Sequence, residues 1–156
     1  MFVHETVHFM LCLIVGFVFV YIYKNWWLII YSFLAGLFLD ADHLTDYFLF
    51  RHSFAFNLHE FLSGTYFDAS NRVYLFLHGY EYALIFFLTV AILLFNKKRF
   101  KNTTTSVAAL MVIATSIFLH LVYDEAYYQP RLLTYSITYR ASHNFNHDFL
   151  EFTVKK

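Results

Sequence analysis

Long apolar segments alternate with short polar ones along this chain. Each apolar segment is long enough, or nearly so, to cross the roughly 30 Å hydrocarbon core of a bilayer as an α-helix. Tryptophans and tyrosines around the junction of the first two segments fit an interfacial aromatic belt. The pattern predicts four transmembrane helices, which cover approximately residues 6–23, 26–44, 73–95 and 105–128.

The connections between these segments predict the topology. Short polar turns join the first helix to the second and the third to the fourth, so consecutive helices should be up-and-down neighbours. Residues 45–72 form the longest connection, and an amphipathic stretch at 54–62 predicts a short interfacial helix. From Pro130 onward the chain is polar and aromatic, and we expect it to lie along the membrane surface. The predicted fold class is all-α, with residues 1–156 forming a single membrane-embedded domain.

Composition supports a membrane location and excludes several classes of protein. Hydrophobic residues make up 60% of the chain and charged residues 14%, and the single proline and four glycines leave little for a turn-rich β protein. Net charge is zero and no basic stripe with stacking aromatics occurs, so no nucleic-acid partner is expected. The only cysteine, Cys12, excludes a disulfide framework and a thiolate zinc site. We expect an integral protein of a bacterial or archaeal cytoplasmic membrane, with membrane lipid as its surroundings.

Ionisable residues gather at one end of the predicted bundle. An up-and-down arrangement brings the starts of the first and third helices to the same membrane face as the ends of the second and fourth. That face receives His4, His8, Asp40, Asp42, His43, His78, Glu81, His120, Asp124 and Glu125. The opposite face carries a basic cluster at 97–101, which predicts that it is cytoplasmic and that the ionisable face points outward. Ionisable groups within a membrane are expensive and are usually functional.

Helical spacing pairs many of these residues on common faces. The i,i+3 and i,i+4 pairs are Asp40/His43, His78/Glu81, His4/His8 and His120/Asp124. Asp42 points elsewhere on an ideal helix, so it acts either from a frayed end or from behind the ligands. Nitrogen and oxygen donors presented in this way are how metal sites are built in the cores of helix bundles.

Charge counting favours a metal site. Several carboxylates at close range raise one another's pKa, and one or two divalent cations would balance them. Imidazole and carboxylate ligands suit zinc above all, and also manganese or iron. A single membrane His or Glu is more often a helix–helix hydrogen-bond partner, so the prediction rests on the joint set. The predicted ligands are His8, Asp40, Asp42, His43, His78, Glu81, His120 and Asp124, with His4 as the alternative N-terminal ligand.

Three motifs follow the N-terminal histidines in a fixed order. They are Leu39-Asp-Ala-Asp-His43, Leu77-His-Gly-Tyr-Glu-Tyr82 and His120-Leu-Val-Tyr-Asp124. This order resembles the YdjM-like inner-membrane metal-dependent hydrolases, which carry Pro-Asp-x-Asp-His, His-Arg-Gly-x-Thr-His-Ser and His-x-x-x-Asp. The chain departs from that pattern at the leading proline and at Thr-His-Ser, where Glu81 would replace a histidine.

The resemblance implies hydrolysis of an ester or phosphoester bond in a membrane-associated, lipid-like substrate. A bound divalent ion would activate water for this reaction, and Asp42 or Glu81 would act as general base. Two other classes stay open, a proton- or metal-coupled transporter and a non-catalytic scaffold with a buried polar network. A di-iron oxidase typically has Glu-x-x-His on two helices, whereas His-x-x-Glu occurs once here.

Overall fold

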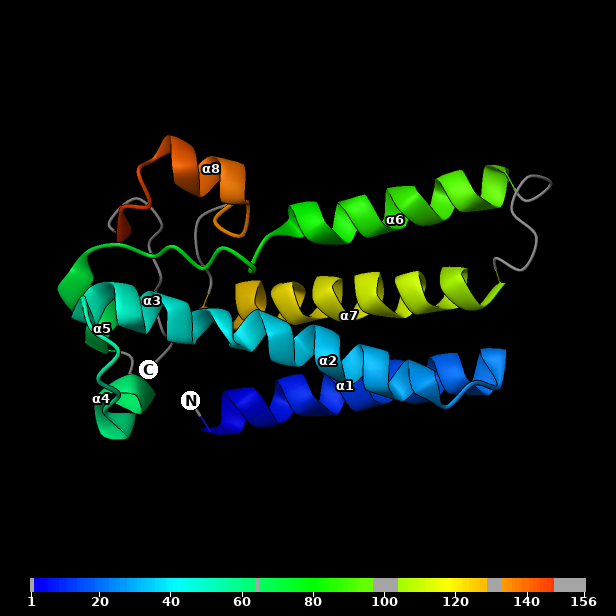
Figure 1. Ribbon diagram of the computed structural model, residues 1–156, viewed down its shortest axis with the longest axis horizontal. Helices are drawn as coiled ribbons and strands as arrows, with labels where there is room; N and C mark the ends of the chain where they lie inside the picture. The colour runs from blue at the N-terminus through cyan, green and yellow to red at the C-terminus, as the bar shows by residue number, and fades with distance from the viewer. Residues whose placement is uncertain (1, 64, 97–103, 129–132, 148–156) are drawn as a thin grey trace.

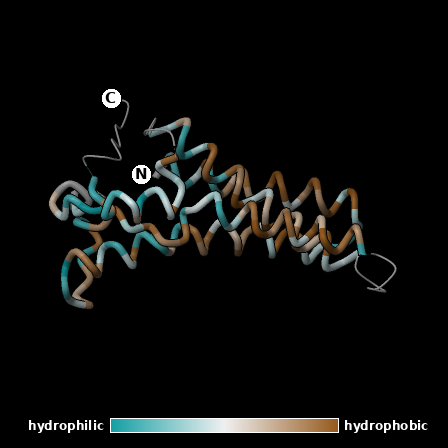
Figure 2. The backbone as a smooth tube through the Cα atoms, turned by 90° about the horizontal axis from the view of Figure 1, so that it is seen from above, coloured by the Kyte–Doolittle hydropathy of each residue, from teal (hydrophilic) through white to brown (hydrophobic). Residues whose placement is uncertain are grey.

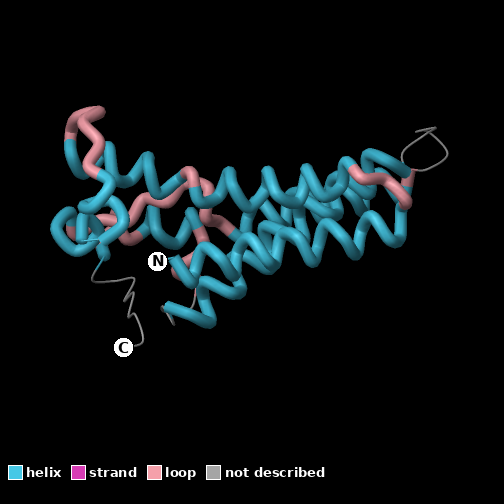
Figure 3. Tube along the Cα trace, turned by 90° about the horizontal axis from the view of Figure 1, so that it is seen from below, coloured by secondary structure: helices cyan, strands magenta, loops and turns pink. Residues whose placement is uncertain are grey.

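The computed structural model is a bundle of helices, seen from the side in Figure 1. It describes residues 2–63, 65–96, 104–128 and 133–147, and within these ranges it holds helices and loops but no β-strand (Figure 3). The helices are α1 (Phe2–Tyr23), α2 (Trp27–Asp40), α3 (Asp42–Arg51), α4 (Leu58–Ser63), α5 (Thr65–Ser70), α6 (Tyr80–Phe95), α7 (Thr104–Tyr128) and α8 (Ile137–Ser142). The prediction of an all-α fold is confirmed.

Among the described residues, three stretches of helix are long and apolar enough to cross a membrane: His4–Tyr23, Trp27–Arg51 and Thr104–Tyr128. The helix α6 is also apolar but has 16 residues. At about 1.5 Å per residue it reaches about 24 Å, short of the roughly 30 Å hydrocarbon core. These helices indicate a membrane protein, and Figure 2 shows hydrophobic residues along the bundle with more hydrophilic ones toward the α3–α5 end.

The four long helices run up and down, as predicted (Figure 1). The helix α1 packs on α2, α6 packs on α7, and α7 also contacts both α1 and α2. The core between α1, α2 and α7 is formed by buried residues that include Val15, Leu28 and Val112. Large apolar side chains such as Ile14 and Leu84 are exposed on the outer faces, where lipid tails would surround them.

Small residues let α1 and α2 approach closely. A Cβ atom at Gly36 would stand 2.5 Å from the sulfur of Cys12. Beside this contact, the Ser32 hydroxyl donates to the Cys12 carbonyl oxygen at 2.7 Å and lies 2.7 Å from the hydroxyl of Ser116 on α7. Small residues and interhelical hydrogen bonds are typical of membrane helix contacts, because lipid removes the hydrophobic drive between helices.

The predicted helix boundaries are wrong around the second and third spans. The second span does not end at residue 44 but continues through Ala41, which keeps helical angles, into α3. The third begins at Tyr80 rather than at residue 73, because Gly79 is extended and Leu75 has a positive φ of 39°. Residues 73–79 therefore form a non-helical stretch of backbone, which we call the 73–79 segment.

The long connection also differs from the prediction. The stretch 54–62 is helical only from Leu58, and the helix α5 was not predicted. The described part of the C-terminal region packs on the chain around the 73–79 segment. There the amide of Val73 donates to the carbonyl oxygen of Phe145, and the amide of Tyr80 donates to the carbonyl oxygen of Tyr135. The start of this region at Pro130 and the basic cluster at 97–101 lie outside the described residues.

Candidate metal centre

The predicted site residues meet at one end of the bundle, except for Glu81. The helix α1 contributes two histidines from its first two turns, α2 its last residue, and α7 two residues from its final turns. The buried members are His4, His8, Asp42, His78, His120 and Asp124. The side chain of Asp40 is 26% exposed, against 2% for that of His120, so the cluster opens beside α2.

Three donor atoms converge between α1 and α7. The Nε2 atoms of His4 and His8 lie 3.0 and 2.9 Å from Oδ1 of Asp124, and 2.8 Å from each other. Ligands around an octahedral ion with bonds of about 2.1 Å stand about 3.0 Å apart, so this triangle matches one face of such a site. The sequence left His4 and His8 as alternatives, and the structure places both here. We call these three residues the first group.

A second group forms beside the first. It consists of Asp40, His78 and His120, whose ligand atoms all lie within 4.8 Å of one another. The Nε2 atom of His120 is 3.3 Å from Oδ1 of Asp40. The rings of His120 and His8 lie with their centroids 3.6 Å apart, so the two groups are in contact.

Asp124 joins the two groups. Its Oδ1 faces the two histidines of α1, while its Oδ2 lies 3.5 Å from Nε2 of His120 and 3.9 Å from Nε2 of His78. The side chain is 5% exposed. One carboxylate therefore presents one oxygen to each set of donors, which is how a bridging carboxylate is placed between paired cations.

Many ring nitrogens in the cluster have no hydrogen-bond partner. Both nitrogens of His78 and of His120 are buried without one, and Oδ1 of Asp124 meets no donor in hydrogen-bond geometry despite the short distances. A buried polar group left unpaired is destabilising by about 1–3 kcal/mol, and each case requires an explanation such as an ion. Imidazole and carboxylate donors fit zinc, manganese or iron.

Asp42 and His43 lie next to the two groups but belong to neither. Oδ2 of Asp42 accepts from the Leu77 amide at 2.6 Å and lies 3.5 Å from Nδ1 of His78. This places the carboxylate beside Nδ1 of His78, on the side away from Asp124 but outside hydrogen-bond geometry. The ring of His43 packs edge-on against that of His78, with centroids 5.0 Å apart.

Glu81 lies away from the cluster, contrary to the prediction. The pairing of His78 with Glu81 on one helical face is wrong, because α6 begins after His78. Oε1 of Glu81 instead accepts from the Ser136 hydroxyl at 2.6 Å, and from the hydroxyl and amide of Thr138 at 3.1 and 3.2 Å. Glu81 therefore binds the N-terminal turn of α8.

The sequence did not single out three charged residues near the site. Glu5 is half-buried in the first turn of α1, next to His4. Asp46 is buried one helical turn after Asp42 and accepts from the amides of the 73–79 segment; the i,i+4 spacing of the two aspartates was the signal for it. Arg140, from α8, is fully buried, and nothing in its local sequence indicates this.

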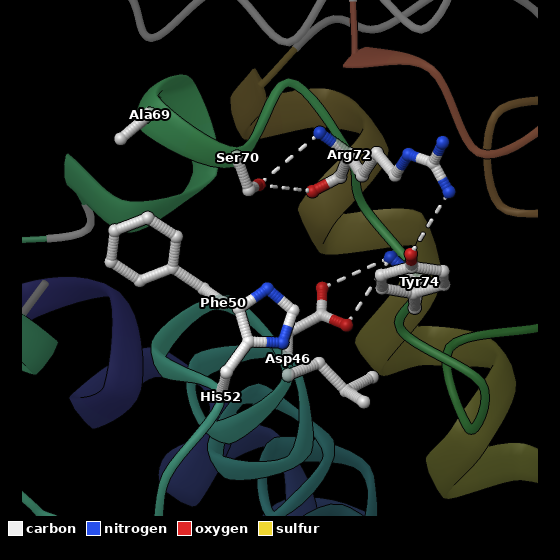
Figure 4. Close-up of a pocket in the computed structure, with 8 residues that line it drawn as sticks. Asp46, Phe50, His52, Ala69, Ser70, Arg72 and Tyr74 are labelled. Carbon is white, nitrogen blue, oxygen red and sulfur yellow. Dashed lines mark hydrogen bonds between the residues drawn. The ribbon is translucent and has the colours of Figure 1, made fainter.

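Asp46 also lines a pocket of about 380 Å³ (Figure 4). Its carboxylate lies 3.0 and 3.2 Å from the backbone nitrogen of Tyr74, as the dashed lines in the figure mark. The guanidinium of Arg72 donates to the side-chain hydroxyl of Tyr74 at 3.3 Å. The pocket is thus formed between α3 and the chain that leads into the 73–79 segment.

The chain matches no family model, and searches of curated proteins and of solved structures find no similar protein. The similarity of the three motifs to the YdjM-like hydrolases therefore stays a prediction. Any conclusion about function has to come from the geometry of the cluster.

Proposed function

We propose that the protein is a membrane-embedded hydrolase that uses two divalent cations to cleave an ester or phosphoester bond of a lipid-like substrate. The observation that carries the proposal is the position of Asp124, with one oxygen toward each group of donors. With Asp124 shared, the first group would offer three protein ligands to its cation and the second group four. The first cation would keep an open position for water or substrate, as catalytic metal sites do. Zinc is the preferred ion, with manganese and iron as alternatives.

The cations would supply the chemistry by lowering the pKa of water and by neutralising charge on the substrate oxygens. The residues of the chain orient the site and handle protons. Asp42 stands beside Nδ1 of His78, where it would orient the ring when a cation is bound at Nε2. Asp40 occupies the accessible edge of the cluster. Asp40 is the most exposed of the three aspartates, so its second oxygen, the one not bound to the cation, would face an entering substrate and accept a proton there. Glu81 accepts a hydrogen bond from the N-cap residue of α8, so we do not assign it the role of general base.

A lipid-like substrate is supported by the surroundings of the open edge. Next to Asp40 on α2, Leu37 and Phe38 are 54% and 66% exposed. Exposed apolar side chains on a membrane-spanning helix would contact lipid tails, so a lipid would place its polar part at Asp40 while its tails stay in the bilayer. This arrangement favours hydrolysis over transport, which requires access to the site from both sides of the membrane.

Elemental analysis tests the proposal. The protein is purified in mild detergent without chelator, beside an Asp40→Ala/His120→Ala variant and a His52→Ala/His59→Ala control in which two exposed histidines are removed. We expect about two equivalents of zinc, manganese or iron in the wild type and the control, and a marked loss in the first variant. Release of phosphate or fatty acid from lipid substrates should follow metal content. Absence of metal after reconstitution with each ion contradicts the proposal, and metal flux into proteoliposomes without hydrolysis supports a transporter instead.

We also propose a bacterial or archaeal cytoplasmic membrane, with the cluster on the outer face. In the sequence the basic residues at 97–101 come between two apolar segments, and short basic connections of this kind are retained in the cytoplasm. Labelling of a cysteine placed at Ser53, near the cluster end, by an impermeant thiol reagent on intact cells tests this orientation. Labelling only after lysis contradicts it.

A further inference from the structure

Buried charged side chains hold the 73–79 segment from two sides. On the α3 side, the carboxylates of Asp46 and Asp42 accept from its backbone amides, at Tyr74 and Leu77 among others. On the other side stands the guanidinium of Arg140. The segment is thus held through its backbone by charged side chains on both sides, in addition to the packing of its buried Val73 and Leu75.

Arg140 makes its hydrogen bonds to backbone carbonyl groups. Its Nη1 donates to the oxygen of Thr134 at 2.8 Å, and its Nη2 donates to the oxygens of Leu75 at 2.6 Å and His78 at 2.8 Å. The residue is fully buried. Burial lowers the pKa of this guanidinium, and the nearby negative charge of Asp42 opposes the shift. Breaking these hydrogen bonds would be strongly destabilising, because it would leave a buried positive charge without compensation.

The position of His78 depends on these bonds. Within the two groups, His78 is the one ligand that no helix carries, since α6 begins two residues later. The backbone around it includes a positive φ at Leu75, which a non-glycine residue adopts only when its surroundings impose it. Arg140 binds both that residue and His78 itself. The α8 helix lies against the same point, because a Cβ atom at Gly79 would stand 2.6 Å from Cδ1 of Ile137.

The first group has no such dependence. His4 and His8 lie on one face of α1, and Asp124 lies on α7, so regular helix geometry and the α1–α7 contact place all three. None of the hydrogen bonds of Arg140 reaches these residues. A change at Arg140 should therefore affect the two groups unequally.

We infer that Arg140 is a positioning residue that holds His78 in the second group, so that the C-terminal segment completes one of the two cation sites while the other forms without it. The inference rests on the proposed function, since it concerns the same pair of sites. The inference adds that the second site depends on α8 and the first does not, which the ligands alone do not predict.

Manganese binding measured by electron paramagnetic resonance tests the inference on the full-length protein in detergent. Two Mn²⁺ ions bridged by Asp124 should give an exchange-coupled spectrum in the wild type. In Arg140→Gln we expect about one ion per chain, with the resolved hyperfine lines of an isolated Mn²⁺ ion. The matched control is Arg72→Gln, which removes an exposed arginine that contacts Tyr74 and should leave the coupled spectrum unchanged.

A second variant covers the case in which Arg140→Gln does not fold. Arg140→Lys keeps the buried positive charge but cannot reproduce the fork of the guanidinium. We expect it to weaken the second ion about 10- to 100-fold, the usual effect of losing a residue that orients a ligand, and to leave the first ion unchanged.

The outcomes separate the inference from the proposed function. Wild-type affinity for both ions in the Arg140 variants, or equal weakening of both ions in a folded variant, overturns the inference and leaves the proposed function standing. A wild-type protein that takes up no metal overturns both.

Discussion

Replacing Asp124 by asparagine tests whether one carboxylate serves both groups of donors. Asparagine keeps the size of the side chain and removes its negative charge. At an effective dielectric constant of about 20, two unit charges about 4 Å apart interact by about 4 kcal/mol, and a divalent cation at bonding distance interacts more strongly. Taking about 4 kcal/mol as a lower bound, the dissociation constant of each cation should rise about a thousandfold. Both sites should weaken, because the two oxygens of Asp124 face different groups.

Thermal unfolding in detergent measures this loss of metal affinity. At a metal concentration of about 100 times the wild-type dissociation constant, each bound ion should stabilise the wild type by about 2.7 kcal/mol. At the same concentration, a thousandfold weaker site contributes less than about 0.1 kcal/mol. The melting temperature of Asp124→Asn should therefore not respond to metal that raises the melting temperature of the wild type.

The matched control is Glu125→Gln, the next residue of α7. Glu125 accepts from the hydroxyl of Tyr80 and belongs to neither group, so its variant should keep the full response to metal. A response in Asp124→Asn equal to that of the wild type would refute the bridging role. A response reduced by half would also refute it, because it would assign Asp124 to a single cation.

Three further predictions concern packing and the C-terminal segment. Gly36→Ala should destabilise the protein by about 1–3 kcal/mol in a reversible unfolding assay, because the new methyl group collides with Cys12. Adding Cys12→Ala should relieve much of this loss. A Gly36→Ala variant with wild-type stability contradicts the close α1–α2 contact. A double-mutant cycle of Ser32→Ala and Ser116→Ala should give a coupling energy of about 0.6 kcal/mol, the mean for hydrogen bonds between membrane helices, and a coupling of zero argues against that bond. Glu81→Gln should speed proteolysis within α8 while metal content stays unchanged, and loss of metal would return Glu81 to the ligand set.

Much of the site follows from regular helix geometry. His4 and His8, and likewise His120 and Asp124, are one helical turn apart, and the structure presents each pair on one face, as the spacing predicts. The up-and-down order of the helices brings both pairs and Asp40 to the same end. Regular helices transmit sequence spacing directly into space, so these positions were readable without a structure.

The positions that prediction missed lie where the helix stops. Extending the third helix back to residue 73 put Glu81 beside His78 in the cluster, whereas the non-helical backbone before Tyr80 turns Glu81 toward α8. For Asp42 the sequence left two roles open, and the structure decides between them, because the helix continues past Ala41 and turns this carboxylate toward the 73–79 segment, behind the ligands.

The sequence by itself determined the class of protein, the helices and the end of the bundle that holds the ionisable groups, because hydropathy and helical spacing are local properties of the chain. Only the tertiary structure decided how the donors divide into two groups around Asp124 and which residues hold His78. The 73–79 segment has no periodicity of its own, and its conformation is imposed by hydrogen bonds from Asp46, 28 residues away, and from Arg140, 65 residues away. Contacts between residues so far apart in the sequence depend on the whole fold, so they cannot be predicted from a local sequence pattern.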